Sequence, residues 1–188
     1  SMARMQKIDS SAYDFYPKTW ILPSEKYELQ LYLKHNINNA RDKDRCVIVK
    51  PSGGAQGKGI YLAIHPHDIL PTDDAVAQVY VPRPLLIDGF KFDLRIYALI
   101  TCVDPLRILL YREGLVRLCT TPYEAPNIGN ADCAFMHLTN YAVNKHNDGF
   151  VQNDGRDEDE ASKRSLSWLW GWMEERDMDA YGVWQNIA

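Results

Sequence analysis

The sequence lacks an apolar run long enough to span a membrane, and it does not begin with a charged segment followed by an apolar one. These absences predict a soluble chain with neither a membrane span nor a secretory signal. Four cysteines are present, but none forms a Cys-x-x-Cys pair, and three lie in or beside apolar runs. We therefore expect free thiols, a reducing compartment and no structural zinc.

The sequence also lacks an excess of positive charge and any internal repeat. Its formal net charge is −4, which argues against a general nucleic-acid binder. Basic residues nevertheless cluster locally, between Lys91 and Arg117. The length of 188 residues, with 46% hydrophobic and 24% charged residues, fits one globular core or two small lobes.

One stretch, residues 91–100, alternates charged or polar residues with apolar ones. Successive side chains of a β-strand point to opposite faces, so this stretch predicts a strand with one apolar and one charged face. The charged face would carry Lys91, Asp93, Arg95 and Tyr97. Such a row suits a polyphosphate and its metal, but an isolated row of this kind is more often an exposed sheet face with ion pairs.

A glycine-rich segment, residues 50–59, lies between two β-branched or apolar runs. A Walker loop or a Rossmann fingerprint needs a helix after its glycines, whereas residues 60–64 are short and strand-like. The pattern predicts a strand, a turn and a second strand. Its backbone N–H groups could close over phosphates, with Lys50 and Lys58 supplying positive charge. The alternative is an ordinary mobile hairpin.

Residues 75–81 form another predicted strand, which ends at two prolines around Arg83. We expect a hinge between two lobes here. A hinge strand could offer edge N–H and C=O groups to an adenine ring, and the alternative is a plain linker.

A three-stranded meander is predicted next, from residues 91–101, 107–111 and 115–120, with Arg117 joining the charged face. Residues 1–17 are expected to form an arm across a surface. A helix is predicted from Ser162, and its apolar stripe would contain Leu166, Leu169, Trp170 and Met173.

Five blocks follow one another along the chain: Phe15–Pro23, Val49–Pro51 with its glycine-rich loop, Pro84–Arg95, Tyr111–Gly114 and His137–Tyr141. Together they resemble the tubulin-tyrosine-ligase-like family, amino-acid ligases of the ATP-grasp fold. The resemblance implies an α+β fold of two lobes with mainly antiparallel sheets and a missing C-terminal part. Its expected segments are an arm (1–17), a central lobe with the glycine-rich loop (18–81) and the start of the C-terminal lobe (82–188).

The resemblance also implies site residues. Lys50 looks like the lysine that binds the nucleotide phosphates, and Gln56 and Gly57 look like the tip of the loop. The other ATP contacts it implies are Gln78, Val79, Tyr80, Val81, Lys91, Phe92, Asp93, Thr139 and Asn140. The incoming amino acid would be held by Arg117, Tyr141 and Lys163, and the catalytic cations would be Arg95 and Arg117.

The segment 162–167 resembles the family branch that adds glutamate, so the implied activity is ATP-dependent glutamylation of tubulin C-terminal tails through an acylphosphate. The implied partners are tubulin tails, microtubules and free glutamate, with ATP and Mg²⁺ as cofactors. Family members place their magnesium carboxylates in a later segment, so no metal ligand is expected in this chain. A cytoplasmic, cytoskeletal monomer is expected, with the cilium, flagellum and basal body as further locations.

Three alternatives remain open at this stage. The chain could be a tubulin-tail binding module without chemistry, a tyrosine or glycine ligase of the same family, or an ATP-grasp ligase that acts on small molecules. His137 and His146 could act as bases, but a histidine in a polar loop is more often a hydrogen-bonded structural group.

Overall fold

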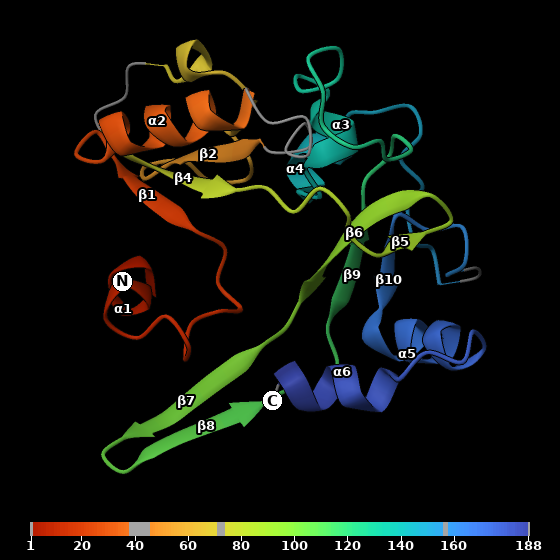
Figure 1. The fold of residues 1–188 in the computed structure, drawn as a ribbon. Helices are drawn as coiled ribbons and strands as arrows, with labels where there is room; N and C mark the ends of the chain where they lie inside the picture. Colours follow the sequence, from red (N-terminus) through yellow and green to blue (C-terminus); the bar gives the residue numbers. More distant parts are fainter. Residues whose placement is uncertain (1, 38–45, 71–73, 156–157, 188) are drawn as a thin grey trace. The chain divides into compact units, whose positions relative to one another are not determined.

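The computed structural model describes residues 2–37, 46–70, 74–155 and 158–187, and within them it has an α+β fold with antiparallel sheets, as predicted (Figure 1). The helices are α1 (Met2–Ile8), α2 (Lys26–Ile37), α3 (Ala134–His137), α4 (Tyr141–Asn144), α5 (Leu166–Glu174) and α6 (Ala180–Ile187), with a 3-10 turn η2 (Pro66–Asp68). The strands are β1 (Thr19–Leu22), β2 (Val47–Pro51), β3 (Tyr61–Ala63), β4 (Ala75–Val79), β5 (Leu86–Ile87), β6 (Phe90–Arg95), β7 (Ala98–Val103), β8 (Leu106–Leu110), β9 (Leu115–Leu118) and β10 (Lys163–Ser165).

The chain divides into two compact units. The first contains Ser1–Pro84 and Glu124–His137, and the second contains Leu85–Tyr123 and Leu138–Ala188. The three segments expected from the sequence (1–17, 18–81 and 82–188) stay a prediction. Residues 2–8 form the helix α1, although the sequence suggested only an arm there.

The first unit is built on a four-stranded antiparallel sheet in the order β1-β4-β2-β3, with α2 lying along it (Figure 1). Alternate residues of the strands turn to one face, so Val47 and Val49 of β2 are buried while Ile48 between them is only partly so. Leu29 and Leu33 lie one helical turn apart on α2 and are fully buried in the same core. This packing holds β2 and β4, which carry the candidate residues of the unit.

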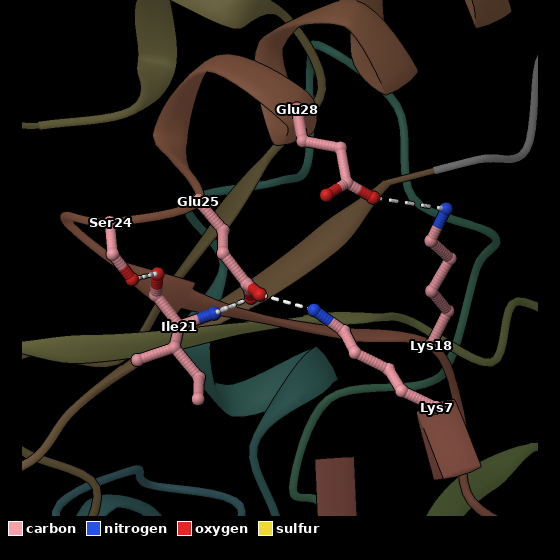
Figure 2. A network of polar contacts seen from close by, with 6 residues as sticks. All are labelled: Lys7, Lys18, Ile21, Ser24, Glu25 and Glu28. Carbon is pink, nitrogen blue, oxygen red and sulfur yellow. Dashed lines mark hydrogen bonds and ion pairs between the residues drawn. The ribbon is translucent and has the colours of Figure 1, made fainter. Parts of the chain in front are cut away.

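Polar contacts fix the chain where β1 leads into α2 (Figure 2). The Glu25 carboxylate accepts a hydrogen bond from the Ile21 N–H at 2.6 Å and pairs with the Lys7 ammonium of α1. Ser24 donates its hydroxyl to the Ile21 carbonyl at 3.0 Å. A second ion pair, Lys18–Glu28 at 3.7 Å, is more exposed. Glu25 therefore joins α1, β1 and the start of α2.

The second unit contains a four-stranded antiparallel sheet in the order β10-β9-β6-β5, covered by α5 and α6. The helix predicted from Ser162 begins at Leu166, because residues 163–165 form β10 and Ser165 caps the helix by accepting the Trp168 N–H at 3.1 Å. Leu166, Leu169 and Met173 are buried as predicted. Trp172, rather than Trp170, completes the buried stripe.

The turn before β9 is closed around Glu113 and Gly114. The Glu113 carboxylate accepts the Gly114 N–H at 2.9 Å and the Leu166 N–H at 2.8 Å, so it ties this turn to the first turn of α5. A Cβ atom on Gly114 would lie 2.3 Å from the Arg95 carbonyl oxygen. Only glycine permits this approach of the turn to the end of β6.

The predicted meander is wrong. The run from residue 91 to 101 is interrupted at Ile96 and Tyr97, where the strand changes its partner. β6 pairs with β9 and β5, whereas β7 pairs only with β8 in a separate two-stranded sheet. Most of this β7–β8 hairpin is exposed, and its exposed large apolar side chains are Leu99, Ile100, Val103, Leu106, Ile108 and Leu109.

Replacement of Glu25 by Gln is expected to destabilise the protein at neutral pH. Burial raises the pKa of Glu25, but hydrogen bonds from Lys7 and the Ile21 N–H and the charge of Lys7 outweigh it, so the pKa lies below the ordinary 4.5. The stabilisation is therefore present above the unfolded pKa and is lost as the pH falls through the folded pKa. Thermal denaturation across this range should show the difference between the two proteins shrinking in acid.

The matched control is Glu28→Gln, three residues further along, in the first turn of α2. Its ion pair with Lys18 is 3.7 Å long and its side chain is 57% exposed, so we expect a smaller loss of stability. Equal melting temperatures for Glu25→Gln and the unsubstituted protein at neutral pH would contradict the role of Glu25.

Candidate functional site

Lys50 on β2 begins a chain of hydrogen bonds across the sheet of the first unit. Its ammonium donates to Gln78 Oε1 at 3.0 Å, and Gln78 Nε2 donates to the Thr19 hydroxyl at 3.0 Å. Thr19 donates in turn to the Pro17 carbonyl at 2.8 Å. Three neighbouring strands thus orient one lysine through neutral groups.

The electrostatics of Lys50 follow from this arrangement. The side chain is half-buried, and burial lowers the pKa of its ammonium below the ordinary 10.5. Among the residues that the structure describes, no carboxylate forms an ion pair with it. A partly desolvated cation without a counter-charge gains most from an anionic ligand, because the ligand replaces lost hydration with direct attraction.

The glycine-rich loop joins β2 to β3 without a helix, which confirms the predicted order of strand, turn and strand. Gln56, Gly57 and Gly59 have φ values of 60°, 86° and 71°. These values lie in the left-handed region that glycine adopts without strain. A Cβ atom on Gly54 would lie 2.9 Å from the Lys58 carbonyl oxygen, so the loop also needs glycine for its close turns.

The predicted hinge strand differs from expectation in one respect. β4 ends at Val79 and lies between β1 and β2, so it is not an edge strand. The Val79 N–H donates to the Lys18 carbonyl at 2.9 Å, and the Tyr80 N–H donates to the Cys46 carbonyl at 2.9 Å. The sequence could not show that β1, far away in the chain, would pair here. These two N–H groups are engaged within the unit. The adenine contacts expected at residues 78–81 stay a prediction.

His137 is a buried member of the first unit. It is 2% exposed, its Nδ1 lies 3.1 Å from the Tyr80 hydroxyl, and its Nε2 lies 3.0 Å from the Asn130 carbonyl oxygen. A carbonyl only accepts, so Nε2 donates to Asn130, and in the neutral ring Nδ1 is the acceptor that faces the Tyr80 hydroxyl. This geometry favours the structural interpretation of His137 over a catalytic one.

In the second unit, Asp93 on β6 and Arg117 on β9 lie directly opposite each other. Arg117 Nε donates to Asp93 Oδ1 at 2.8 Å, and its Nη2 donates to Oδ2, so the pair is bidentate. This hydrogen bonding, opposed by burial, raises the pKa of Arg117 above its ordinary value. The predicted sharing of one sheet face is confirmed for these residues, and their roles stay predictions.

Lys163 on β10 continues the row, because it lies opposite Arg117. Its ammonium is 4.3 Å from the centroid of the Tyr141 ring, and the Lys145 ammonium is 5.7 Å from the same centroid. The structure thus brings together Asp93, Arg117, Lys163 and Tyr141. A ligand carboxylate at this face would meet cationic side chains such as Arg117 and Lys163, and it would share Arg117 with the carboxylate of Asp93.

The remaining predicted residues lie around this row. Arg95 is exposed at the end of β6, and Lys91 lies opposite Leu86 of β5. Phe92 packs against the core, on the face opposite to Asp93. Thr139 and Asn140 directly precede α4. The predicted residues of the glycine-rich loop and hinge belong to the first unit, and those from Lys91 onward belong to the second.

The sequence model described as "Tubulin-tyrosine ligase family" matches residues 1–188. The chain belongs to the tubulin-tyrosine ligase family. Among curated relatives, it is 45% identical over 187 residues to "Tubulin polyglutamylase ttll6" of Danio rerio and 44% identical over 187 residues to "Tubulin polyglutamylase TTLL13" of Mus musculus. It is 43% identical over 188 residues to "Tubulin polyglutamylase TTLL7" of Mus musculus. Each comparison covers 100% of this chain and 23%, 22% and 20% of the respective relative.

The chain therefore spans about a fifth of the length of the curated relatives it matches. The family resemblance inferred from the five sequence blocks is confirmed. None of the described helices is both long and apolar enough to cross a membrane.

Sequence reasoning missed three residues of this tubulin-tyrosine ligase family chain that lie at the site. Lys145 lies beside Tyr141, and the buried Asn144 accepts hydrogen bonds from Thr120, 24 residues earlier. A contact of this separation leaves no local pattern. The only available signal was the polar character of residues 137–145, which the sequence rules could not interpret.

A magnesium ion, which the family implies, does not fit the described residues. Asp93 is the carboxylate at the row, and both of its oxygens accept hydrogen bonds from Arg117. Within the described ranges, no group of three or more His, Cys, Asp or Glu residues could hold a metal ion. Magnesium prefers several oxygen ligands in octahedral geometry. We therefore assign no reaction step to a metal held by these residues.

Replacement of Lys50 by Met is expected to raise the melting temperature of the free protein at neutral pH, because it removes a partly buried charge and keeps an apolar side chain of similar length. Since folding lowers the pKa of Lys50 below 10.5, the native state disfavours the protonated form. The penalty is constant below the folded pKa and disappears as the pH rises from there to 10.5. Melting curves at increasing pH should show the two proteins converging.

The control is Lys58→Met, which removes an exposed lysine from the same loop and should leave the melting temperature nearly unchanged. A lower melting temperature for Lys50→Met at neutral pH would mean that its hydrogen bond to Gln78 outweighs the cost of burying the charge.

Proposed function

We propose that the protein is an ATP-dependent ligase that adds glutamate to glutamate side chains of tubulin C-terminal tails. The observation that carries this proposal is the identity of 40–45% over the whole chain to relatives named tubulin polyglutamylases. The cations of the two units, Lys50 in the first and Arg117 and Lys163 in the second, support it, because every reactant in this reaction is anionic.

The chemistry takes two steps. A carboxylate oxygen of a tail glutamate attacks the γ-phosphorus of ATP, which forms an acylphosphate and releases ADP. The amine of free glutamate then attacks the acyl carbon, an isopeptide bond forms, and inorganic phosphate and a proton leave. Neither step needs a nucleophile from the protein, since positioning and charge neutralisation lower the barriers.

In the first unit, Lys50 would bind the phosphates. Its ammonium is held by Gln78 and lacks an ion-pair partner among the described residues, so it is oriented and still electrostatically available. Gln56 and Gly57, at the left-handed turn of the glycine-rich loop, would cover the same phosphates with backbone N–H groups.

In the second unit, the row of Asp93, Arg117 and Lys163 would receive the amino acid. Arg117 is oriented by Asp93, while Lys163 lies over the ring of Tyr141. The two carboxylates of free glutamate would pair with Arg117 and Lys163, and its ammonium would pair with the Asp93 carboxylate. Thr139 and Asn140 would contact ATP, and Arg95 and Arg117 would neutralise the charge that develops during transfer.

The acceptor would be an acidic, disordered tail, which the basic residues of β6, β9 and β10 can attract although the whole chain has a net charge of −4. This substrate would place the protein on the microtubule cytoskeleton. The expected cilium, flagellum and basal body locations and the monomeric state are part of the same proposal.

ATP at millimolar concentration is expected to raise the melting temperature of this chain, because a ligand that binds only the native state stabilises it by mass action. Lys50→Met should lose most of this shift even though its free form is not destabilised. Lys34→Met, which removes an exposed lysine from α2, should keep it. Equal shifts in all three proteins would refute the assignment of Lys50.

Arg117→Lys keeps the charge but loses the bidentate fork, so we expect glutamate transfer to fall about tenfold or more while ATP binding is retained. The assay is mass spectrometry of tubulin tail peptides after incubation with the whole protein and glutamate, glycine or tyrosine. Arg107→Lys on the exposed β8 is the control. Parallel loss of ATP binding and transfer would show that Arg117 does not serve the amino acid alone.

A tubulin-tail binding module without catalysis is the second candidate. It is favoured by one observation, the lack of a metal-binding group among the described residues. This candidate predicts that tail peptides bind while millimolar ATP leaves the melting temperature unchanged.

A further inference from the structure

Asn144, the last residue of α4, is a buried polar residue with all of its hydrogen-bonding capacity satisfied. It is 1% exposed. Its Oδ1 accepts the Thr120 N–H at 3.0 Å and the Thr120 hydroxyl at 2.9 Å. Its Nδ2 donates to the Leu138 carbonyl at 2.6 Å and to the Asn140 carbonyl at 3.1 Å. A buried amide with four partners is held in one orientation.

The chemistry of the partners determines which end of the amide faces which group. The Thr120 N–H can only donate, so Oδ1 must face it, whereas the two carbonyls can only accept, so Nδ2 must face them. No other side chain of this size offers two acceptor and two donor positions at once. Aspartate would retain the bonds to Thr120 but would turn an oxygen toward two carbonyl oxygens.

The four bonds join two parts of the proposed site. Thr120 lies two residues beyond β9, the strand that carries Arg117. Leu138 and Asn140 flank Thr139 and directly precede Tyr141. Residues 138–140 are outside regular secondary structure, and α4 is a single turn of four residues. Such a segment does not hold its own conformation.

We propose that Asn144 is a positioning residue, which fixes Thr139, Asn140 and Tyr141 against the end of β9 and hence against Arg117. This inference rests on the proposed function, since those residues are its expected nucleotide and amino-acid contacts. Local backbone bonds, such as the Val143 N–H to the Asn140 carbonyl at 3.0 Å, shape the turn itself. The Asn144 side chain adds a connection across 24 residues of sequence.

The test is a set of variants of the same chain. Thr120→Val is nearly isosteric and removes one of the four bonds, while Thr120→Ser retains the hydroxyl and should restore the behaviour of the unsubstituted chain. Asn144→Asp removes both bonds to the carbonyls. Asn147→Asp is the matched control, because Asn147 accepts only a local bond from the Gly149 N–H at 2.8 Å among its described side-chain contacts.

Binding of ATP and of glutamate is measured by calorimetry at a temperature where circular dichroism shows every variant to be folded. We expect dissociation constants about tenfold higher for Asn144→Asp and several-fold higher for Thr120→Val, with Thr120→Ser and Asn147→Asp close to the unsubstituted chain. The loss in Asn144→Asp should become smaller in acid, because a protonated carboxyl can donate to one of the carbonyls.

The outcomes are separable. Variants with lower melting temperatures but unchanged dissociation constants would show that Asn144 only stabilises the fold, and the inference would be wrong while the proposed function stood. If Asn144→Asp does not fold, Thr120→Val and Thr120→Ser decide the question in the same way. If the unsubstituted chain binds neither ATP nor glutamate, the proposed ligand contacts fail, and the positioning role fails with them.

Discussion

The bidentate pair of Asp93 and Arg117 is the contact on which the second unit's candidate site depends. Both residues lie in the interior of the β10-β9-β6-β5 sheet, directly opposite each other, so the register of β6 and β9 and the geometry of the pair determine each other. A slip of one residue would turn Arg117 to the core face. The same register places Lys163 next in line on β10. Strand pairing, rather than any loop, therefore sets the spacing of the charges.

The environment of Lys50 in the first unit is the opposite of that of Arg117, because its partners are neutral rather than charged. Lys50 is held by neutral groups, in a chain that runs through Gln78 to Thr19, and burial lowers its pKa. The charge of Arg117 is balanced by the Asp93 carboxylate, whose hydrogen bonds raise the pKa of Arg117. An oriented lysine that has no ion-pair partner among the described residues suits a ligand with several negative charges. An arginine whose Nε and Nη2 are held by Asp93 offers its remaining N–H donors in a fixed direction, which suits a single carboxylate. The two environments match the proposed division between nucleotide and amino acid.

Much of the local structure was predictable from the sequence, because the signals were local. The glycines between β2 and β3, the alternation around Asp93 and the burial of Leu166, Leu169 and Met173 on α5 each follow from the spacing of a few neighbouring residues, although the stripe takes Trp172 in place of the predicted Trp170. Errors arose where a distant partner decided the outcome. β4 is central because β1 pairs with it, and the run from 91 to 101 is divided because its partner changes from β9 to β8. The role of Asn144 was not predicted for the same reason, since its partner Thr120 lies 24 residues earlier in the chain.

The β7–β8 hairpin has a consequence for the behaviour of the isolated chain in solution. The cross-strand pairs Leu99–Leu109 and Ile100–Ile108 fall on alternate faces of the hairpin, so both faces expose apolar side chains. The only charged residue of β8 is Arg107. Exposed apolar strands that carry little charge tend to pair with strands of other molecules, because no repulsion between charges opposes this association. At high protein concentration, the chain would therefore aggregate through the β7–β8 hairpin. Sulfate, which strengthens apolar association, would increase this aggregation.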